Sequence, residues 1–120
     1  MFELVFYEDG KGYSSIVELL DKLKQESSYD KNARISRNKI LAYMQKLASQ
    51  GTLIGMPFVR KLGGRLWELR PGNYRLFFFL WKNNMIVLLH YYIKKSKRTP
   101  VRELLTAQNN ISSWLKRYGK

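Results

Sequence analysis

Six side chains that can bind phosphate or transfer protons lie close together in the second half of the chain. They are Glu68, Arg70, Arg75, His90, Tyr92 and Lys94. An arginine guanidinium group grips phosphate oxygens with its planar fork and can stabilise charge that develops on phosphorus. A carboxylate, imidazole, phenol or ammonium group can transfer protons during attack by a ribose 2′-hydroxyl group. The set therefore suits phosphodiester cleavage without a metal ion.

Side-chain alternation along three predicted strands places these six residues on one face of a sheet. The strands are expected at residues 65–70, 74–81 and 85–93, with turns at Pro71-Gly72-Asn73 and Asn83-Asn84. Tight hairpins should set Arg75 opposite Tyr92 and Phe77 opposite His90. One inserted residue in either hairpin would reverse the faces beyond it. The opposite face should pack on helices and is expected to carry Trp67, Leu69, Tyr74, Leu76, Phe78, Tyr91 and Ile93.

Several of these side chains also have a purely structural interpretation. Glu68 could form a plain cross-strand ion pair with Arg75. His90 is flanked by apolar residues, where a histidine commonly serves as a hydrogen-bonded structural residue, and Tyr92 is equally open. Two arginines on an inward sheet face, however, need an anion or a carboxylate beside them. Arg70 and Arg75 are therefore the strongest candidates for binding phosphate.

The remaining elements predict one α+β domain over residues 1–120. We expect a strand at 2–7, a helix opened by Ser15, a helix from after Asp30 to Gly51, a loop at 51–64, and a C-terminal helix opened by Thr99-Pro100. Ser15 and Glu18 form a capping-box pattern. The expected order is β-α-α-β-β-β-α, with a small antiparallel β-sheet packed on helices.

Positive charge is concentrated in the second half of the chain. Residues 51–120 contain 14 Lys/Arg and 2 Asp/Glu, whereas residues 1–50 contain 8 and 7, for a net charge of +13. A charge field confined to one half of a small domain favours a polyanionic partner. Further candidates for binding RNA are Arg60, Lys61, Arg65, Lys95, Lys97 and Arg98.

Composition excludes several other classes of function. The chain has no cysteine and one histidine, so we expect no disulfide, no thiolate chemistry, no multi-histidine metal site and no cofactor. The N-terminal residues lack the pattern of a signal peptide, and the longest apolar runs, Leu76–Trp81 and Met85–His90, are too short to span a membrane. We therefore expect a cytoplasmic protein.

Three motifs together resemble the RelE/ParE superfamily of bacterial toxins, and within it the HigB branch with its phage-type HigB-like proteins. The resemblance covers residues 60–107 best. The motifs are Leu66-Trp67-Glu68-Leu69-Arg70, Tyr74-Arg75-Leu76-Phe77-Phe78, and Leu88–Ile93 followed by Lys94-Lys95-Ser96-Lys97-Arg98-Thr99-Pro100.

The resemblance implies a small sheet packed on helices with a basic cleft. It also implies a toxin of a type II toxin-antitoxin system that cleaves messenger RNA on the ribosome as a metal-independent endoribonuclease. The implied partners are the ribosome, messenger RNA and a helix-turn-helix, HigA-like antitoxin, in a heterotetramer with the toxin.

Residue roles carry over from the resemblance at a few positions. Arg75 matches the arginine that contacts the scissile phosphate, and Arg70 matches the basic position at the end of the preceding strand. Phe58 stands where some relatives have a glutamate as general base, so the acid and base stay open. The remaining matches are to basic segments before and after the sheet: Arg60, Lys61, Lys94, Lys95, Lys97 and Arg98.

Two other functions stay open. The ParE branch shares the fold but inhibits DNA gyrase without nuclease activity, and paired arginines in a cleft favour the nuclease over it. A non-catalytic RNA-binding module would bind RNA in a salt-dependent way without cleaving it.

Overall fold

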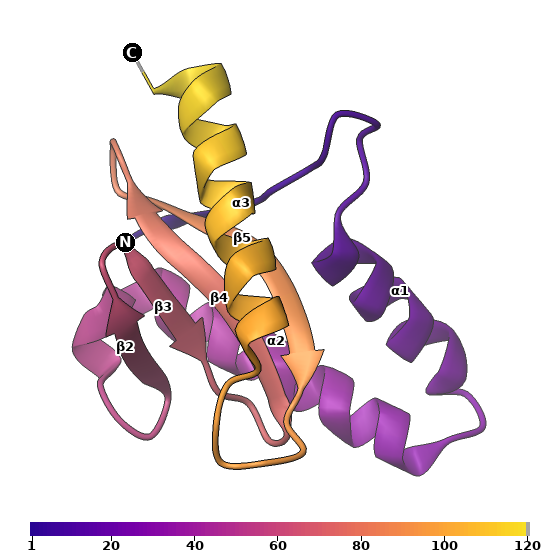
Figure 1. The fold of residues 1–120 in the computed structure, drawn as a ribbon. Helices are drawn as coiled ribbons and strands as arrows, with labels where there is room; N and C mark the ends of the chain where they lie inside the picture. Colours follow the sequence, from indigo (N-terminus) through magenta and orange to yellow (C-terminus); the bar gives the residue numbers. More distant parts are fainter. Residues whose placement is uncertain (120) are drawn as a thin grey trace.

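The computed structural model describes residues 1–119 and combines three α-helices with a five-stranded sheet (Figure 1). The elements are β1 (Glu3–Phe6), α1 (Ser15–Glu26), α2 (Lys31–Gln50), a 3-10 helix (Gly51–Ile54), β2 (Val59–Gly63), β3 (Leu66–Leu69), β4 (Tyr74–Trp81), β5 (Met85–Ile93) and α3 (Val101–Tyr118). The expected α+β class is confirmed. No helix within the described residues is long and apolar enough to cross a membrane.

The expectation of a loop over residues 51–64 is wrong, because this segment contains a 3-10 helix and strand β2. Strand β2 lies at the edge of the sheet and pairs antiparallel with β3. Its burial pattern is weak, with Val59 buried and Arg60 and Lys61 exposed. Charged side chains are common on edge strands, so the segment lacks the continuous apolar run that marks the central strands β4 and β5.

The sheet is mixed, not purely antiparallel as expected. The strand order is β1-β5-β4-β3-β2, and β1 runs parallel to β5. The chain leaves β1 through two helices and three strands before it reaches β5. A long connection of this kind allows two strands to run in the same direction, whereas tight hairpins force the other neighbours to be antiparallel.

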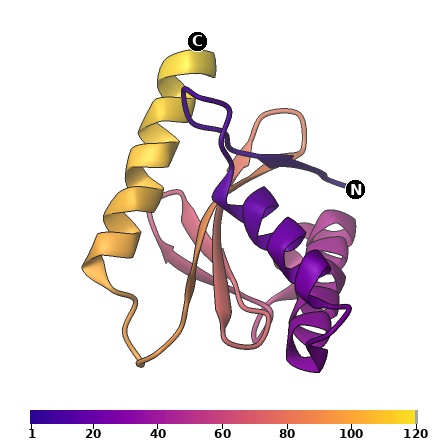
Figure 2. The ribbon, with the colours of Figure 1, turned by 90° about the vertical axis from the view of Figure 1, so that its right-hand side faces the viewer.

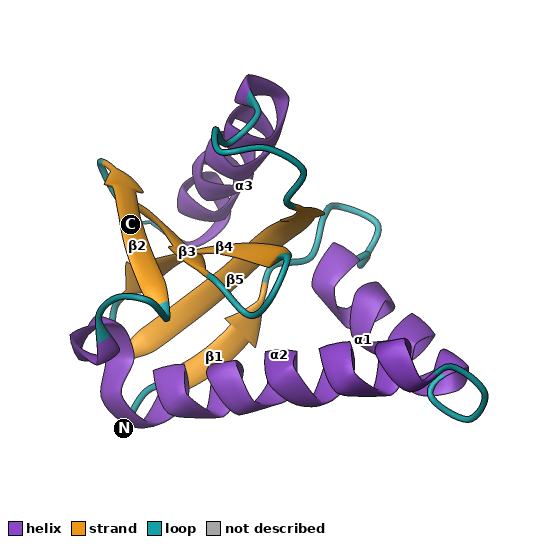
Figure 3. Ribbon diagram, turned by 90° about the horizontal axis from the view of Figure 1, so that it is seen from below, coloured by secondary structure: helices purple, strands orange, loops and turns teal. Residues whose placement is uncertain are grey.

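Helices cover both faces of the sheet. Figures 2 and 3 show α1 and α2 together on one face and α3 on the other. The α1/α2 side carries the buried Leu69, Leu76 and Phe78 with the partly buried Trp67, Tyr74 and Tyr91. This agrees with the apolar face expected from alternation, except that Ile93 is 47% exposed. The α3 side is a second core of Leu66, Phe77, Phe79, Val87, Leu89, Ala107, Ile111 and Trp114.

Helix ends match the expected caps in one case and differ in two. Asp30 caps α2 by accepting hydrogen bonds from the backbone amides of the next turn, as expected. The cap of α1 is Ser14, not Ser15, because the Ser14 hydroxyl accepts the Val17 amide at 3.2 Å. The hydroxyl of Thr99 makes no cap for α3 and instead accepts the Tyr92 phenol at 3.3 Å. Ser15 and Thr99 are therefore free to contact β5.

The β4–β5 turn is one residue longer than expected. Trp81 pairs with Met85, which leaves three residues, 82–84, in the turn. Asn83 and Asn84 have φ of 60° and 57°, the left-handed conformation expected of these asparagines. Taken alone, the extra residue would move every β5 side chain to the opposite face.

A bulge at Leu89 cancels this shift. Phe78 pairs with Leu88 but Phe77 pairs with His90, so Leu89 has no partner on β4. Leu89 and His90 both lie on the α3 side of the sheet, since Leu89 is buried in the α3 core and His90 stacks on Phe77. Beyond the bulge, the pairing is the one that the sequence predicts.

Candidate active site

Four cations surround one buried carboxylate near the turn between β3 and β4. We call Arg60, Arg70, Arg75, Lys94 and Glu68 the cation cluster. Arg60 pairs across the strands with Glu68, and the Arg70 Nε atom lies 3.4 Å from Glu68 Oε2. Arg75 and Lys94 also act on the Glu68 carboxyl electrostatically. Four positive charges against one negative charge leave an excess that suits a phosphate group.

The Glu68 side chain is buried at the floor of this cluster, with 2% exposure. Burial raises the pKa of its carboxyl group, and Arg70, Arg75, Arg60 and Lys94 oppose that effect. Its contact with Arg70 has the distance of an ion pair but not the geometry of a hydrogen bond, and the Oε1 atom has no hydrogen-bond partner. Glu68 therefore acts as a counter-charge that gathers cations.

Arg75 is also part of the floor, with 6% exposure. One nitrogen of its guanidinium group donates to the carbonyl oxygens of Gly72 at 2.8 Å and Tyr74 at 2.9 Å. Burial lowers the pKa of Arg75, and the neighbouring positive charge of Arg70 lowers it further. Arg75 thus braces the β3–β4 turn, while the more exposed Arg60, Arg70 and Lys94 are the cations that a ligand reaches first.

One of the two open interpretations of Glu68 is a cross-strand ion pair with Arg75, but the structure gives its ion contact another partner. Glu68 lies opposite Phe77, one pair away from the Arg75–Tyr92 pair, and its ion contact is with Arg70. Both arginine side chains lie on the same face as Glu68, as alternation predicts, but the guanidinium of Arg75 turns toward the backbone of the adjacent turn.

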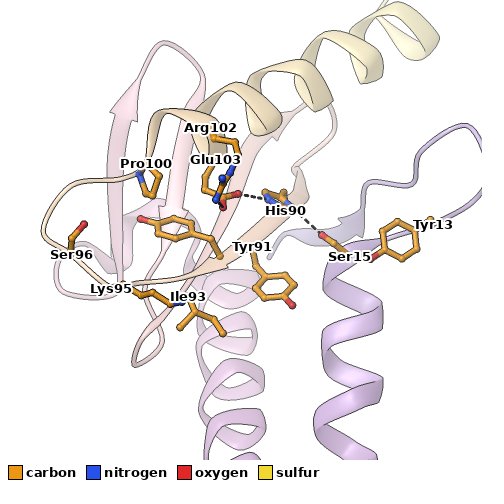
Figure 4. Close-up of a pocket in the computed structure, with 11 residues that line it drawn as sticks. Tyr13, Ser15, His90, Tyr91, Ile93, Lys95, Ser96, Pro100, Arg102 and Glu103 are labelled. Carbon is orange, nitrogen blue, oxygen red and sulfur yellow. Dashed lines mark hydrogen bonds and ion pairs between the residues drawn. The ribbon is translucent and has the colours of Figure 1, made fainter.

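A pocket of about 470 Å³ lies at the free end of β5, and its wall includes Tyr92, the cross-strand partner of Arg75. Strand β1 pairs with β5 only up to Leu88, so residues 90–93 have an open edge between the starts of α1 and α3. Figure 4 shows His90 between Ser15 and Glu103 in this pocket. His90 Nε2 lies 2.8 Å from Glu103 Oε1, and His90 Nδ1 lies 3.4 Å from the Ser15 hydroxyl oxygen. The pocket wall also includes Tyr13, Tyr91, Tyr92 and Lys95.

Tyr92 connects the pocket to the cation cluster. It lines the pocket and pairs across the strands with Arg75, as predicted. Phe77 stacks on both Tyr92 and His90, with ring centroids 5.5 and 6.2 Å apart. The largely buried Tyr92 therefore lies between the proton-transfer groups of the pocket and Arg75 of the cation cluster.

The structure separates two of the predicted RNA-binding residues from this surface. Lys61 lies over the Trp67 ring, 5.9 Å from its centroid, on the side of α1 and α2. Arg65 lies over Phe79 and Trp81 at the opposite end of the sheet, 5.4 and 5.5 Å from their centroids. Both cations thus pack against aromatic rings away from the cluster.

The other basic candidates remain near the site. Lys94 and Lys95 follow β5 directly, and Lys95 lines the pocket. Lys97 and Arg98 are exposed on the connection to α3. Alternation along the strands could not reveal Ser15 and Glu103, because they reach His90 from two helices and not from the sheet.

Within residues 1–119, no group of three or more histidine, cysteine or acidic side chains is placed to hold a metal ion. The titratable groups here are organised by ion pairs and hydrogen bonds among side chains. Such a site can bind an anion and transfer protons with protein groups alone.

Comparisons with known proteins give both structural similarity and a family. The YoeB-YefM complex from Staphylococcus aureus is similar in structure, with a TM-score of 0.47 and 16% sequence identity over 80% of this chain and 98% of that chain. No match was found among curated proteins. The model of the phage-derived Gp49-like protein family matches residues 18–112. Because this match spans most of the chain and the whole candidate site except Tyr13 and Ser15, the protein belongs to the phage-derived Gp49-like family.

Proposed function

We propose that this protein is the toxin of a type II toxin-antitoxin system and acts as a metal-independent endoribonuclease on messenger RNA. The Gp49-like family is a family of RelE/YoeB-type toxins, which supports the toxin class. The cation cluster beside a pocket of proton-transfer groups supports the nuclease chemistry. The main support for the proposal is the cation cluster. Its four positive charges exceed the single negative charge of the buried carboxylate, so the cluster can bind an anion.

The cation cluster supplies the electrostatic part of the reaction. The guanidinium of Arg70 and the ammonium of Lys94 approach the scissile phosphate, with Arg60 next to them on the edge strand. Charge that builds up on the phosphoryl oxygens during attack is then opposed by cations already in place, which lowers the barrier without reorganisation. Glu68 holds these like charges together before RNA binds.

The pocket supplies the groups that surround the nucleotide. Tyr13 and Tyr91, which are more exposed than Tyr92, present rings on which an unpaired base can stack. Lys95 lies at the pocket wall for an adjacent phosphate. A messenger RNA held in single-stranded form on the ribosome offers such bases. The ribosome is therefore the expected setting of the cleavage, in the cytoplasm.

Growth arrest and RNA cleavage test this proposal directly. The Arg70→Gln/Lys94→Gln double variant should lose cleavage of ribosome-bound messenger RNA by at least about a hundredfold, in line with the loss of an electrostatic catalyst. A Lys22→Gln/Lys24→Gln double variant on α1 removes the same charge outside the cluster and serves as the matched control. Mapping of new RNA 5′ ends after induction measures the cleavage in cells. Equal cleavage by the two double variants would refute the site.

The same preparations separate the competing functions. Inhibition of gyrase supercoiling without new RNA ends would favour a ParE-like toxin. Salt-dependent RNA binding without cleavage would show a binding module.

The proposed partner is a cognate HigA-like helix-turn-helix antitoxin. The net charge of +13 favours a partner with an acidic surface. Co-expression with the neighbouring open reading frame should relieve growth arrest and yield a stable complex. Arrest that persists despite a confirmed complex would contradict neutralisation by that partner.

A further inference from the structure

We propose that Glu103 is a positioning residue that fixes the tautomer of His90 and leaves His90 Nδ1 as the proton acceptor of the site. The role of His90 Nδ1 in cleavage rests on the proposed function. The tautomer of His90 is a property of the free protein and does not depend on that function. It selects one base among the candidates Glu68, His90, Tyr92 and Lys94. It also brings in two residues, Glu103 and Ser15, that the strand pattern does not contain.

The hydrogen bond to Glu103 decides which imidazole nitrogen carries the proton. A carboxylate can only accept, so the 2.8 Å contact between His90 Nε2 and Glu103 Oε1 requires the proton on Nε2. Neutral His90 then has its lone pair on Nδ1. A carboxylate behind an imidazole fixes its orientation and tautomer and stabilises the imidazolium that forms when it accepts a proton.

The Nδ1 atom is only weakly engaged in the free protein. Its neighbour is the Ser15 hydroxyl at 3.4 Å, which is long for a hydrogen bond of this type. Ser15 can donate here because Ser14, not Ser15, caps α1. A substrate hydroxyl that enters the pocket can therefore replace Ser15 as the donor to Nδ1.

Other candidates are less suited to accept the proton. Glu68 is buried at 2% exposure beneath the cluster and lines no part of this pocket. Lys94 is a cation with no lone pair in its charged form. The Tyr92 phenol donates to Thr99 at 3.3 Å, so its proton is already directed away from the pocket.

The position of His90 relative to the cations also fits. On the adjacent strand, His90 lies opposite Phe77 and Tyr92 lies opposite Arg75. His90 and Arg75 are therefore diagonal neighbours across the two strands, a position in which residues are about 7–8 Å apart. This separation leaves room for a nucleotide whose phosphate contacts the cluster while its ribose lies beside the imidazole.

These groups account for every bond and proton in the cleavage step. The 2′-oxygen forms a bond to phosphorus as its proton passes to His90 Nδ1, and the bond from phosphorus to the 5′-oxygen breaks. The leaving oxygen takes a proton from water. The products are a 2′,3′-cyclic phosphate and a 5′-hydroxyl group, and the imidazolium held by Glu103 returns its proton to solvent.

The single histidine makes the tautomer directly measurable. Nitrogen-15 NMR spectra of the free protein, recorded at a pH at which the imidazole is observed to be neutral, should show one protonated Nε2 and one unprotonated Nδ1. In Glu103→Gln the amide can either accept from or donate to Nε2, so the Nδ1-protonated form should become populated. Glu103→Asp keeps a carboxylate and should keep the wild-type tautomer. Glu3→Gln, an exposed change on β1, is the matched control. Amide dispersion in the same spectra reports whether each variant is folded.

Cleavage kinetics provide the second measurement. Glu103→Gln should lower kcat by about a hundredfold, the range of general acid–base catalysis, with KM within about twofold of wild type. Glu103→Asp should recover much of this loss, and Glu3→Gln should show none. A wild-type imidazole protonated on Nδ1, or a folded Glu103→Gln variant with unchanged tautomer and unchanged kcat, would overturn the inference.

The two proposals fail in different ways. A wild-type protein with the Nε2-protonated imidazole but no RNA cleavage would refute the nuclease function and with it the role of Nδ1 as base. A nuclease whose kcat is unchanged in Glu103→Gln would keep the proposed function and refute the positioning role.

Discussion

Replacing Arg75 by alanine should destabilise the fold as well as the site. The guanidinium is buried and donates two hydrogen bonds to the carbonyl oxygens of Gly72 and Tyr74. The variant removes both bonds and one of the four cations that oppose the charge of Glu68. The β3–β4 turn, which positions Arg70, then loses its brace.

The size of this effect follows from the contacts. A hydrogen bond from a charged donor contributes about 1.5–3 kcal/mol, so two set an upper range of about 3–6 kcal/mol. Gly72 is exposed, and water can replace the lost donor at its carbonyl oxygen. We therefore expect a loss of about 2–4 kcal/mol in the free energy of unfolding, or roughly 10 °C in Tm for a domain of this size.

Chemical denaturation of Arg75→Ala and Arg70→Ala side by side measures this effect. Arg70 is more exposed and its contact with Glu68 lacks hydrogen-bond geometry, so its replacement should cost less than the replacement of Arg75. Cleavage assays on Arg75→Ala must then be run well below its lowered Tm. A stability of Arg75→Ala within about 0.5 kcal/mol of wild type would refute the bracing role, since that is the scatter of ordinary surface changes.

Three further predictions concern charge and register. Burial raises the pKa of Glu68, so the stability that this carboxyl contributes is present below its ordinary pKa and is lost as pH rises through its folded-state pKa. The stability of Glu68→Gln relative to wild type should therefore increase between about pH 4 and pH 8, and a decrease in denaturation experiments would show that the cations outweigh burial. Arg70→Gln should reduce the slope of log K against log salt for single-stranded RNA by about 0.7, the value for one lost phosphate contact, and an unchanged slope would exclude that contact. Deletion of Leu89 should cost about 2–5 kcal/mol, as for other losses of a buried leucine, yet keep Arg75 opposite Tyr92 because the bulge alone is removed. Cross-strand NOEs between Arg75 and Tyr92 would check this, and their loss would mean that the bulge does more than restore register.

Local sequence signals determined much of the architecture. Asp30 and Gly51 mark the ends of α2 because capping depends on residues within one turn. Continuous apolar runs located β4 and β5, since a strand in the centre of a sheet that is covered on both faces buries side chains on both of them. Charge distribution alone pointed to an anionic ligand and to residues 51–120 as the part of the chain that binds it.

The register of the site was right for a reason that the sequence did not show. The expected two-residue turn is in fact three residues long, and the bulge at Leu89 restores the pairing of Arg75 with Tyr92. Two one-residue shifts cancel because both the α1/α2 core and the α3 core must be filled. Leu88 packs in the first of these cores and Leu89 in the second.

The sequence by itself determined which residue types share the sheet face, because alternation is a local property of a strand. Only the tertiary structure decided that Arg75 is a buried brace, that Lys61 and Arg65 lie elsewhere, and that Glu103 and Ser15 meet His90. Glu103 lies 13 residues from His90 and Ser15 lies 75 residues away. Contacts of this kind depend on how helices pack against the sheet, and no spacing along a single element encodes them.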